Sequence, residues 1–259
     1  MDKTRRPKCQ REAIKKAQPH ARKGSEWFAT FFLDMAKQFG PISTRTENSI
    51  HWVLNLGSEQ GGRRRAMQCI DSIEYKGHFI NIFPDGDIPN PREEFDHLGT
   101  MVCFHRRYKL GDRHTFRDPD EFAEFLKEEK PICLPLYLFD HSGITISTKN
   151  ERFRACDPQG WDWGMLGYIY VTKENVRKEY GVKRVTRKIL EKVTKLLEAE
   201  VDEYDHYLTG NVYGYEITKD GKPQTGDVLD SCWGFLGYPE DYMIAAAKAV
   251  IDQIISEAA

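Results

Sequence analysis

The feature that most constrains the fold is a helical hydrophobic pattern over residues 185–208. Apolar side chains recur there at spacings of three and four residues, and charged side chains fill the positions between them. Gly210 follows the pattern, as a glycine often follows the end of a helix. A helix with one apolar face must bury that face, so the pattern predicts a long helix packed against another layer of the protein.

Short segments with the character of β-strands surround this helix. Lys76-Gly77 separates two of them, residues 73–75 and 78–83, and predicts a hairpin turn. Asp118-Pro119 predicts the start of a short helix. Further predicted elements are strands at 100–104, 132–139, 144–148, 164–171, 212–218 and 228–235, and a C-terminal helix from about Pro239. Pro135, inside the second of these strands, indicates an edge or a bulge.

These elements alternate without a regular βαβ repeat, which favours the α+β class. We therefore predict a mainly antiparallel sheet packed by the long helix and the C-terminal helix, preceded by an N-terminal helical module. The glycine- and arginine-rich stretch 57–65 marks a boundary between the two parts. The predicted organisation is an arm at 1–23, a small helix-plus-strand module at 24–66, and a main α+β domain at 67–259.

The N-terminal arm differs in charge from the rest of the chain. Residues 1–23 contain nine lysines and arginines against Asp2 and Glu12, a net charge of +7, so the rest of the chain carries −9. A basic arm on an acidic body fits a contact with nucleic-acid phosphates. A solubilising or targeting tail explains the same composition.

Cysteine usage and hydropathy limit the classes of protein that the chain can belong to. The six cysteines lie far apart and form no CxxC pair, which argues against a zinc ribbon and a disulfide framework. No apolar run reaches 18 residues, so no membrane-spanning helix is expected, and the N-terminus lacks the apolar region of a secretion signal. We expect a protein of a reducing cytoplasm, with no cofactor and no membrane partner.

The strongest candidate site lies at the end of the predicted strand 100–104. His105, Arg106, Arg107 and Tyr108 follow this strand directly, with Arg113 close behind. Arginine forks match phosphate and carboxylate geometry, and a tyrosine can stack on a base. The alternative is structural, with an arginine simply paired to Asp112 or Glu94. Since Arg106 and Arg107 are adjacent in sequence, we expect only one of them to serve a given pocket.

A second candidate contact is the loop 157–164, with the sequence DPQGWDWG. Trp161 and Trp163 stand in a turn-rich segment, where an exposed tryptophan indicates a binding surface. Core packing is the alternative use of such rings.

Four residues could contribute to catalysis: His105, Asp140, His141 and Cys232. His141 follows Asp140 in a turn between two predicted strands, where it could act as a general base oriented by Asp140 or another carboxylate. The alternative is a plain turn motif. Cys232 could be a nucleophile paired with His141 or His105, or a buried structural cysteine. No metal site is predicted, because the acidic and histidine residues considered for one are not at HxH, HExxH or DxD spacings; they are Asp140, His141, Asp205, His206 and Asp230.

Five segments together resemble a family of proteins encoded mainly by tailed phages of bacteria and by viruses of archaea. The resemblance covers about residues 73–259. It rests on the stretches 90–112, 135–148, 167–186, 203–215 and 230–237, which include LGTMVCFHRRYKLGD, DHSG and DSCWGF. It implies a viral accessory protein that works in the cytoplasm of an infected prokaryotic cell, and it transfers no activity, fold or catalytic set.

Two functional hypotheses follow. The first is a binding protein that engages host nucleic acid or the host-defence machinery through basic and aromatic patches, and inhibits that defence. The second is a small hydrolase or transferase with His141 or His105 as base, Cys232 or a water as nucleophile, and an arginine as anion clamp.

Overall fold

The computed structural model describes residues 68–258, which form two compact units. Residues 86–212 form one of them, here the inserted unit, and residues 68–85 with 213–258 form the other, here the terminal unit. The arm and the module predicted at 1–23 and 24–66 lie outside the described residues. The single main domain expected from residue 67 onward therefore consists of two units, each with its own sheet and core.

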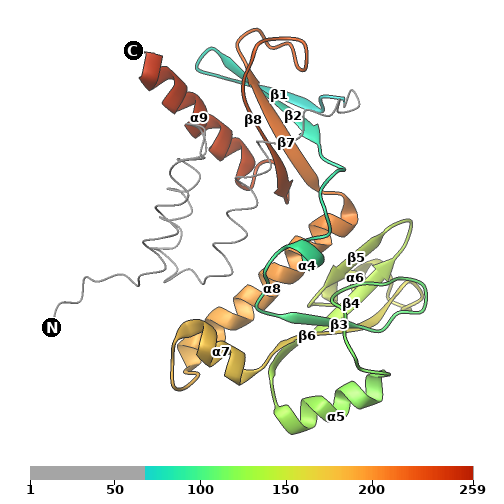
Figure 1. Ribbon diagram of the computed structural model, residues 1–259. Coiled ribbons are helices and arrows are strands. Elements are labelled where there is room, and N and C mark those ends of the chain that lie inside the picture. The colour runs from blue at the N-terminus through green and yellow to red at the C-terminus, as the bar shows by residue number, and fades with distance from the viewer. Residues whose placement is uncertain (1–67, 259) are drawn as a thin grey trace, which may run out of the picture. The chain divides into compact units, whose positions relative to one another are not determined.

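The terminal unit is a four-stranded sheet covered by one helix (Figure 1). The sheet order is β1-β2-β7-β8. The strands are β1 (Asp71–Tyr75), β2 (His78–Pro84), β7 (Val212–Thr218) and β8 (Val228–Leu236), and the helix is α9 (Met243–Ala258). The predicted hairpin is present, because Lys76 and Gly77 both adopt a positive φ between β1 and β2.

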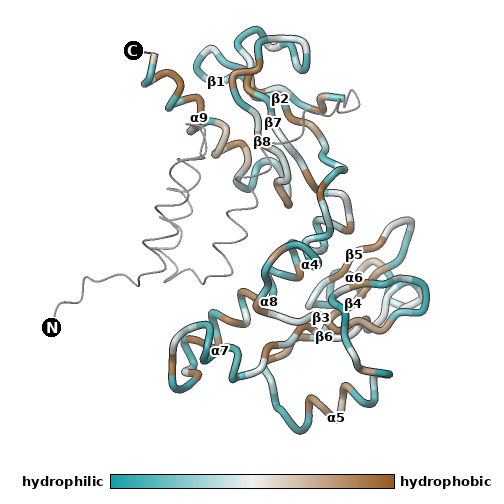
Figure 2. The backbone as a smooth tube through the Cα atoms, viewed as in Figure 1, coloured by the Kyte–Doolittle hydropathy of each residue, from teal (hydrophilic) through white to brown (hydrophobic). Residues whose placement is uncertain are grey.

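Alanines and larger apolar residues of α9 pack this helix against the terminal sheet. Ala246, Ala247 and Ile251 are buried against strand residues that include Ile80 and Ile217. Hydrophobic residues run along much of α9, which is largely brown in Figure 2. The C-terminal helix predicted from the sequence is thus the cover of one sheet.

In the sequence, the inserted unit lies between two strands of the terminal unit that pair with each other. β2 and β7 are antiparallel neighbours, and Pro84 lies opposite Tyr213 in their ladder. The chain leaves β2 at Pro84 and returns at β7, so both connections to the inserted unit depart from one position of the ladder.

A second four-stranded sheet forms the inserted unit, in the order β3-β6-β4-β5. All three pairings are antiparallel. The strands are β3 (Thr100–Cys103), β4 (Ile132–Asp140), β5 (Ile144–Ser147) and β6 (Trp163–Val171). Pro135 is followed by a register shift between Leu136 and Tyr137, which is the bulge that the sequence indicated.

The long helix of the inserted unit covers this second sheet. α8 (Arg187–Thr209) buries Val193, Leu197 and Val201 in a core shared with Ile169 and Leu136 of the strands. The unit also contains α4 (Pro91–Glu94), α5 (Pro119–Glu129), α6 (Glu151–Cys156) and α7 (Lys173–Tyr180). The α+β class is therefore confirmed, with the two predicted helices covering two different antiparallel sheets.

Capping residues define the ends of two of these helices. The Thr186 hydroxyl accepts a hydrogen bond from the backbone N–H of Ile189 at the start of α8, and Gly210 ends the helix with a φ of 73°. The Asp118 carboxylate caps α5 by accepting from Glu121, as its sequence predicted. Among the described helices, none is long and apolar enough to span a membrane.

Candidate functional site

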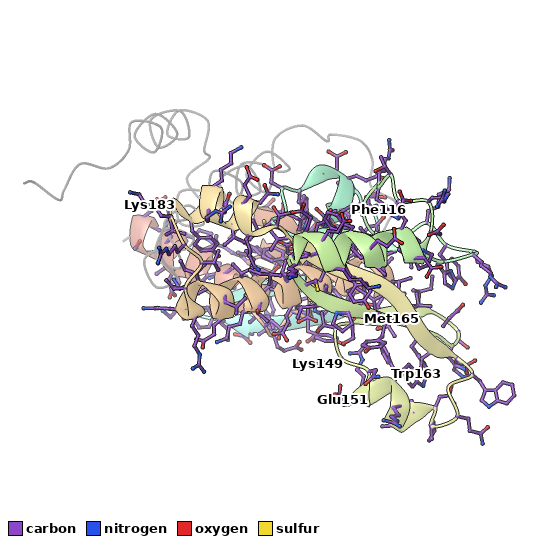
Figure 3. The ribbon with its side chains drawn as sticks, turned by 90° about the horizontal axis from the view of Figure 1, so that it is seen from below. Phe116, Lys149, Glu151, Trp163, Met165 and Lys183 are labelled. Carbon is purple, nitrogen blue, oxygen red and sulfur yellow. The ribbon has the colours of Figure 1, made fainter. Side chains whose placement is uncertain are left out.

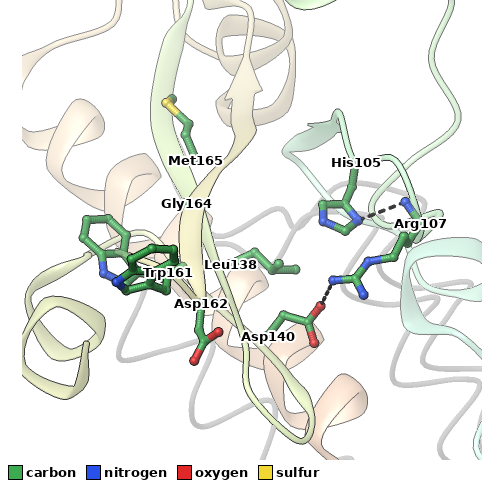
Figure 4. A pocket seen from close by; sticks show the side chains of 9 residues that line it. His105, Arg107, Leu138, Asp140, Trp161, Asp162, Gly164 and Met165 are labelled. Atoms are coloured by element: carbon green, nitrogen blue, oxygen red, sulfur yellow. Dashed lines mark hydrogen bonds and ion pairs between the residues drawn. The ribbon is translucent and has the colours of Figure 1, made fainter. Parts of the chain in front are cut away.

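A pocket of about 270 Å³ opens on the inserted unit, at the end of its sheet where β4 ends and β6 begins (Figure 4). Three segments that are distant in sequence meet there. His105 and Arg107 follow β3, Asp140 ends β4, and residues 161–165 lead into β6. The lining residues are His105, Arg107, Leu138, Asp140, Trp161, Asp162, Trp163, Gly164 and Met165.

Strand pairing brings two of these segments together. Leu138 lies opposite Gly164 in the ladder between β4 and β6, and the backbone N–H of Asp140 donates to the carbonyl of Asp162 at 2.8 Å. The pocket is therefore built on a paired sheet end, which holds its polar side chains in fixed positions.

A tight turn after β3 presents His105. Its Nδ1 accepts hydrogen bonds from the backbone N–H groups of Arg107 (3.3 Å) and Tyr108 (3.2 Å). The neutral imidazole therefore carries its proton on Nε2, which is left as a donor. The His105 ring also stacks on Tyr108, with 4.9 Å between ring centroids and an interplanar angle of 6°.

Asp140 holds the guanidinium of Arg107. The Nη2 of Arg107 lies 2.7 Å from Oδ2 of Asp140, and the Tyr108 hydroxyl donates to the same oxygen at 3.2 Å. The Arg107 side chain remains 71% exposed, so most of its donors face solvent. An exposed ion pair of this kind contributes at most about 1 kcal/mol, and an anionic ligand can therefore compete with Asp140 for Arg107.

Asp157 organises the tryptophan loop. Its Oδ2 accepts from the backbone N–H of Asp162 at 2.8 Å, and its Oδ1 accepts from that of Gly160 at 3.1 Å. These backbone hydrogen bonds, the one from Asp162 above all, lower the pKa of Asp157. The indole N–H of Trp163 donates to the Asp157 carbonyl at 2.8 Å, so a single residue fixes both the turn and one of the two rings.

The other ring projects outward. Trp161 is 79% exposed, and its indole N–H donates to the side chain of Gln159 at 2.6 Å. Met165, which also lines the pocket, is exposed as well. Trp163, by contrast, is half-buried, and its ring contacts that of Tyr137. The loop predicted to present a tryptophan thus does so, and the exposed indole is an apolar platform beside charged groups.

His141 is oriented by a carboxylate, and that carboxylate is Asp162. The Nδ1 of His141 lies 2.7 Å from Oδ2 of Asp162, and the His141 side chain is 66% exposed. The sequence analysis offered Asp140 or another carboxylate for this role, and Asp140 instead binds Arg107. His141 itself is not a lining residue of the pocket, although Asp162 is. A histidine and aspartate pair can move a proton, but this pair includes no nucleophile.

Cys232 belongs to β8 of the terminal unit, whereas the pocket residues belong to the inserted unit. Burial, assisted by the charge of Asp230, raises the pKa of its thiol to about 12. The thiol is therefore protonated at neutral pH, and this argues against Cys232 as a nucleophile, since the thiolate is the reactive form.

The remaining sequence-predicted residues do not line the pocket. Arg106 and Arg113 are exposed outside the pocket lining, so Arg107 is the arginine of the strand end that the pocket uses. Within residues 68–258, no group of three or more His, Cys, Asp or Glu side chains is placed to hold a metal ion.

The sequence analysis proposed the loop 157–164 as a contact but gave no role to its carboxylates Asp157 and Asp162, and it missed Met165. Asp157 acts through hydrogen bonds within its own loop, whereas the positions of Asp162 and Met165 depend on the register between β4 and β6, which no local pattern encodes. The sequence analysis also missed a concentration of basic residues at 173–195, which composition alone could have revealed.

Comparisons with protein-family models, with curated proteins and with solved structures found no match to this chain.

Proposed function

We propose that the protein is a viral accessory protein that binds nucleic acid in an infected prokaryotic cell, and that its pocket receives a single unstacked nucleobase. The observation that carries this proposal is the exposed Trp161 indole in one pocket with the Arg107 guanidinium. The viral setting rests on the sequence resemblance described above. In that setting the nucleic acid, or the defence machinery that acts on it, belongs to the host.

Each wall of the pocket suits one part of a nucleotide. A base can stack on an exposed aromatic ring such as Trp161. The planar fork of Arg107 and the Nε2–H of His105 can both donate to a phosphate. Sites of this composition bind single strands, because the bases of a duplex are already stacked on one another.

The two carboxylates of the pocket point to a preference among bases. Asp140 and Asp162 are hydrogen-bond acceptors, and they disfavour a phosphate in their part of the pocket. They can accept from the amino groups of cytosine, adenine or guanine, as aspartate does with cytosine in base readout. Thymine has no amino group, so we expect oligo-thymidine to bind more weakly than oligo-cytidine.

The volume of the pocket suits one portion of a larger ligand and not a whole cofactor. Sites for whole drug-sized ligands and cofactors enclose about 300–1,000 Å³, and this pocket encloses about 270 Å³. A pocket of this volume suits one base, with the phosphate of the same nucleotide at the rim.

Fluorescence anisotropy with labelled oligo-cytidine of about ten nucleotides tests the proposal, since single-strand sites span about 4–16 nucleotides. Loss of one stacking contact corresponds to about a 5- to 150-fold weaker Kd for Trp161→Ala. Arg107→Lys should also weaken binding, because a point charge does not reproduce the fork.

Two matched controls accompany these variants. Arg117→Ala removes another exposed arginine paired with a carboxylate, and Tyr238→Ala removes another exposed ring. Both should leave the Kd unchanged. Binding by Trp161→Ala that equals the unaltered protein would refute the proposed pocket.

A second candidate function is a hydrolase or transferase in which His141, oriented by Asp162, activates a water. Its test is turnover of the bound oligonucleotide by the unaltered protein and by His141→Ala. The catalytic hypothesis requires cleavage that His141→Ala abolishes while binding persists. Binding without any cleavage leaves the binding protein as the function.

A further inference from the structure

A second segment of the inserted unit carries a high density of positive charge. It comprises residues 173–195, here the basic segment, which span α7, the following loop and the first part of α8. The basic segment holds nine lysines and arginines against three glutamates, a net charge of +6. The rest of the unit, residues 86–172 and 196–212, holds eleven against twenty, a net charge of −9.

The cations of the basic segment are accessible. All nine side chains are exposed. Arg187 pairs with Glu191 one helical turn away. Seven of the others make no side-chain hydrogen bond or ion pair with any residue of the described part of the chain: Lys173, Arg177, Lys178, Lys183, Arg184, Lys188 and Lys195.

The stability of α8 does not explain why cations lie at its N-terminal end. The peptide dipoles of α8 place partial positive charge at its N-terminus, where cations are unfavourable. Arg187 and Lys188 nevertheless occupy its first turn, which contains no acidic residue, while Glu198, Asp202 and Asp205 lie in its second half. The charges of α8 therefore run against its own dipole, and a bound polyanion would compensate the repulsion at its start.

We propose that the basic segment binds the phosphate backbone of nucleic acid, as a sequence-independent contact separate from the base pocket. This inference goes beyond the proposed function, because it rests on charge and exposure and requires no residue of the pocket. Charge complementarity favours a phosphate polymer, since seven accessible cations can neutralise several phosphates at once.

An anionic membrane is a less suitable partner. Binding to a lipid surface needs an apolar helix face that can enter the headgroup region. The apolar face of α8 is already occupied, because Val193, Leu197 and Val201 are buried in the core of the unit. α7 is mostly hydrophilic, as its teal colour in Figure 2 shows, and its buried residue is Val176.

The basic segment and the pocket lie at opposite ends of β6. The strand begins with Trp163 at the pocket and ends at Val171, just before α7, a distance of about 26 Å at 3.3 Å per residue. Figure 3 shows Lys183 at the far end of the unit from Trp163 and Met165. Variants at one site therefore leave the other site intact.

The test is the salt dependence of Kd for a duplex of about 20 base pairs, measured with the full chain between about 50 and 200 mM salt. The double variant Lys183→Glu/Arg184→Glu changes only the loop between α7 and α8. Removing two phosphate contacts should lower the slope of log K against log salt by about 1.8. We expect at least a tenfold weaker Kd at the lowest salt, since charge reversal adds repulsion to this loss.

The matched control is Lys127→Glu/Lys130→Glu, which reverses two exposed lysines of α5 and its cap. This control should keep the slope of the unaltered protein. The basic arm at 1–23 is present in every variant, so it adds equally to all slopes. An unchanged Kd and slope for the 183/184 variant would overturn the inference, as would binding to anionic vesicles without binding to duplex DNA.

These experiments distinguish a failure of the base-pocket proposal from a failure of the basic-segment proposal. If Trp161→Ala binds single strands normally while the 183/184 variant loses slope, the base pocket is refuted and the backbone surface stands. If Trp161→Ala weakens binding while the 183/184 variant behaves like the unaltered protein, the reverse holds.

Discussion

Arg92 and Glu200 form an ion pair inside the inserted unit, with 3.3 Å between Nη1 and Oε2 and with side chains only 1% and 6% exposed. Arg92 also binds Asp112 and donates to the carbonyl of Gly99. Glu200 accepts from the backbone N–H of Leu98 at 2.8 Å. This cluster joins α4, the start of β3 and the middle of α8, so it fixes the strand that leads to the pocket.

Arg92→Ala should destabilise the protein strongly. The variant leaves the Glu200 carboxylate buried without its counter-charge, which costs about 3–5 kcal/mol in comparable pairs. Urea denaturation monitored by circular dichroism measures the loss. Arg117→Ala, at an exposed pair with Asp118, should change the free energy of unfolding far less, because solvent screens such a pair. Equal effects of the two substitutions would show that the buried cluster is not a centre of stability.

The effect of Arg92→Ala should shrink as the pH falls. Burial raises the pKa of Glu200, and Arg92 is the main group that opposes this rise. Without Arg92 the folded state takes up a proton at Glu200 more readily than the unfolded state does. Stability of the variant relative to the unaltered protein should therefore improve from about pH 7 to about pH 5. Denaturation series at the two pH values test this, and a difference that stays constant contradicts it.

Asp157→Ala should loosen the tryptophan loop and weaken oligonucleotide binding while leaving the fold intact. The substitution removes the acceptor of three backbone N–H groups, including those of Asp162 and Gly160. Indole N–H resonances of Trp161 and Trp163 report the change by NMR. Binding that survives unaltered would mean that the loop holds its shape without Asp157.

The same carboxylate should keep the loop ordered in mild acid. Because the folded-state pKa of Asp157 is lowered, its stabilising effect is present above the ordinary aspartate value of about 3.9. That effect is lost only as the pH falls through the lower folded value. The indole resonances should therefore keep their positions down to about pH 4. An indole shift that titrates well above this value would contradict the lowered pKa.

Gly167→Ala should destabilise the inserted unit, whereas Gly164→Ala in the same strand should not. A Cβ at Gly167 would collide with the backbone carbonyl of Val102 on β3, and the φ of Gly167, +158°, is strained for other residues. A Cβ at Gly164 meets nothing within 4 Å. Overpacking of this kind costs about 1–3 kcal/mol. Thermal melts of the two variants give the comparison, and similar melting temperatures would argue against the close approach of β3 and β6.

Residues 86–212 expressed alone should fold. They form one continuous segment with a core of their own, built from α8 and four strands. The expected result is a cooperative urea transition and a retained response of Trp161 fluorescence to oligo-cytidine. A fragment that shows no cooperative transition would mean that the unit depends on the terminal unit for stability.

Local patterns in the sequence predicted the strands β1–β8 and the helices α5, α8 and α9, because each depends on neighbouring residues; the short helices α4, α6 and α7 were not predicted. Asp118 and Pro119 start α5, Gly210 ends α8, and Lys76-Gly77 turns the first hairpin, as expected from their local chemistry. The division into two sheets was not predictable in this way. It depends on the pairing of β2 with β7, whose partners Pro84 and Tyr213 are more than one hundred residues apart.

The candidate site was predictable in part for the same reason. His105 and Arg107 were recognisable as residues at a strand end, and Trp161 as part of an exposed loop. The choice of Asp162 as the partner of His141 depends on a cross-strand register, and so does the approach of Asp140 to Arg107.

Because Pro84 and Tyr213 lie opposite each other in the β2–β7 ladder, the inserted unit can be removed without changing the order of the terminal sheet. Antiparallel strand partners can be joined by a two-residue hairpin turn, and these two residues end and begin such partners. A short turn in place of residues 86–212 would leave β1-β2-β7-β8 in its order, with α9 still following β8. In evolutionary terms, the segment with the pocket and the basic segment can be gained, lost or exchanged without a change in the strand order of the terminal sheet.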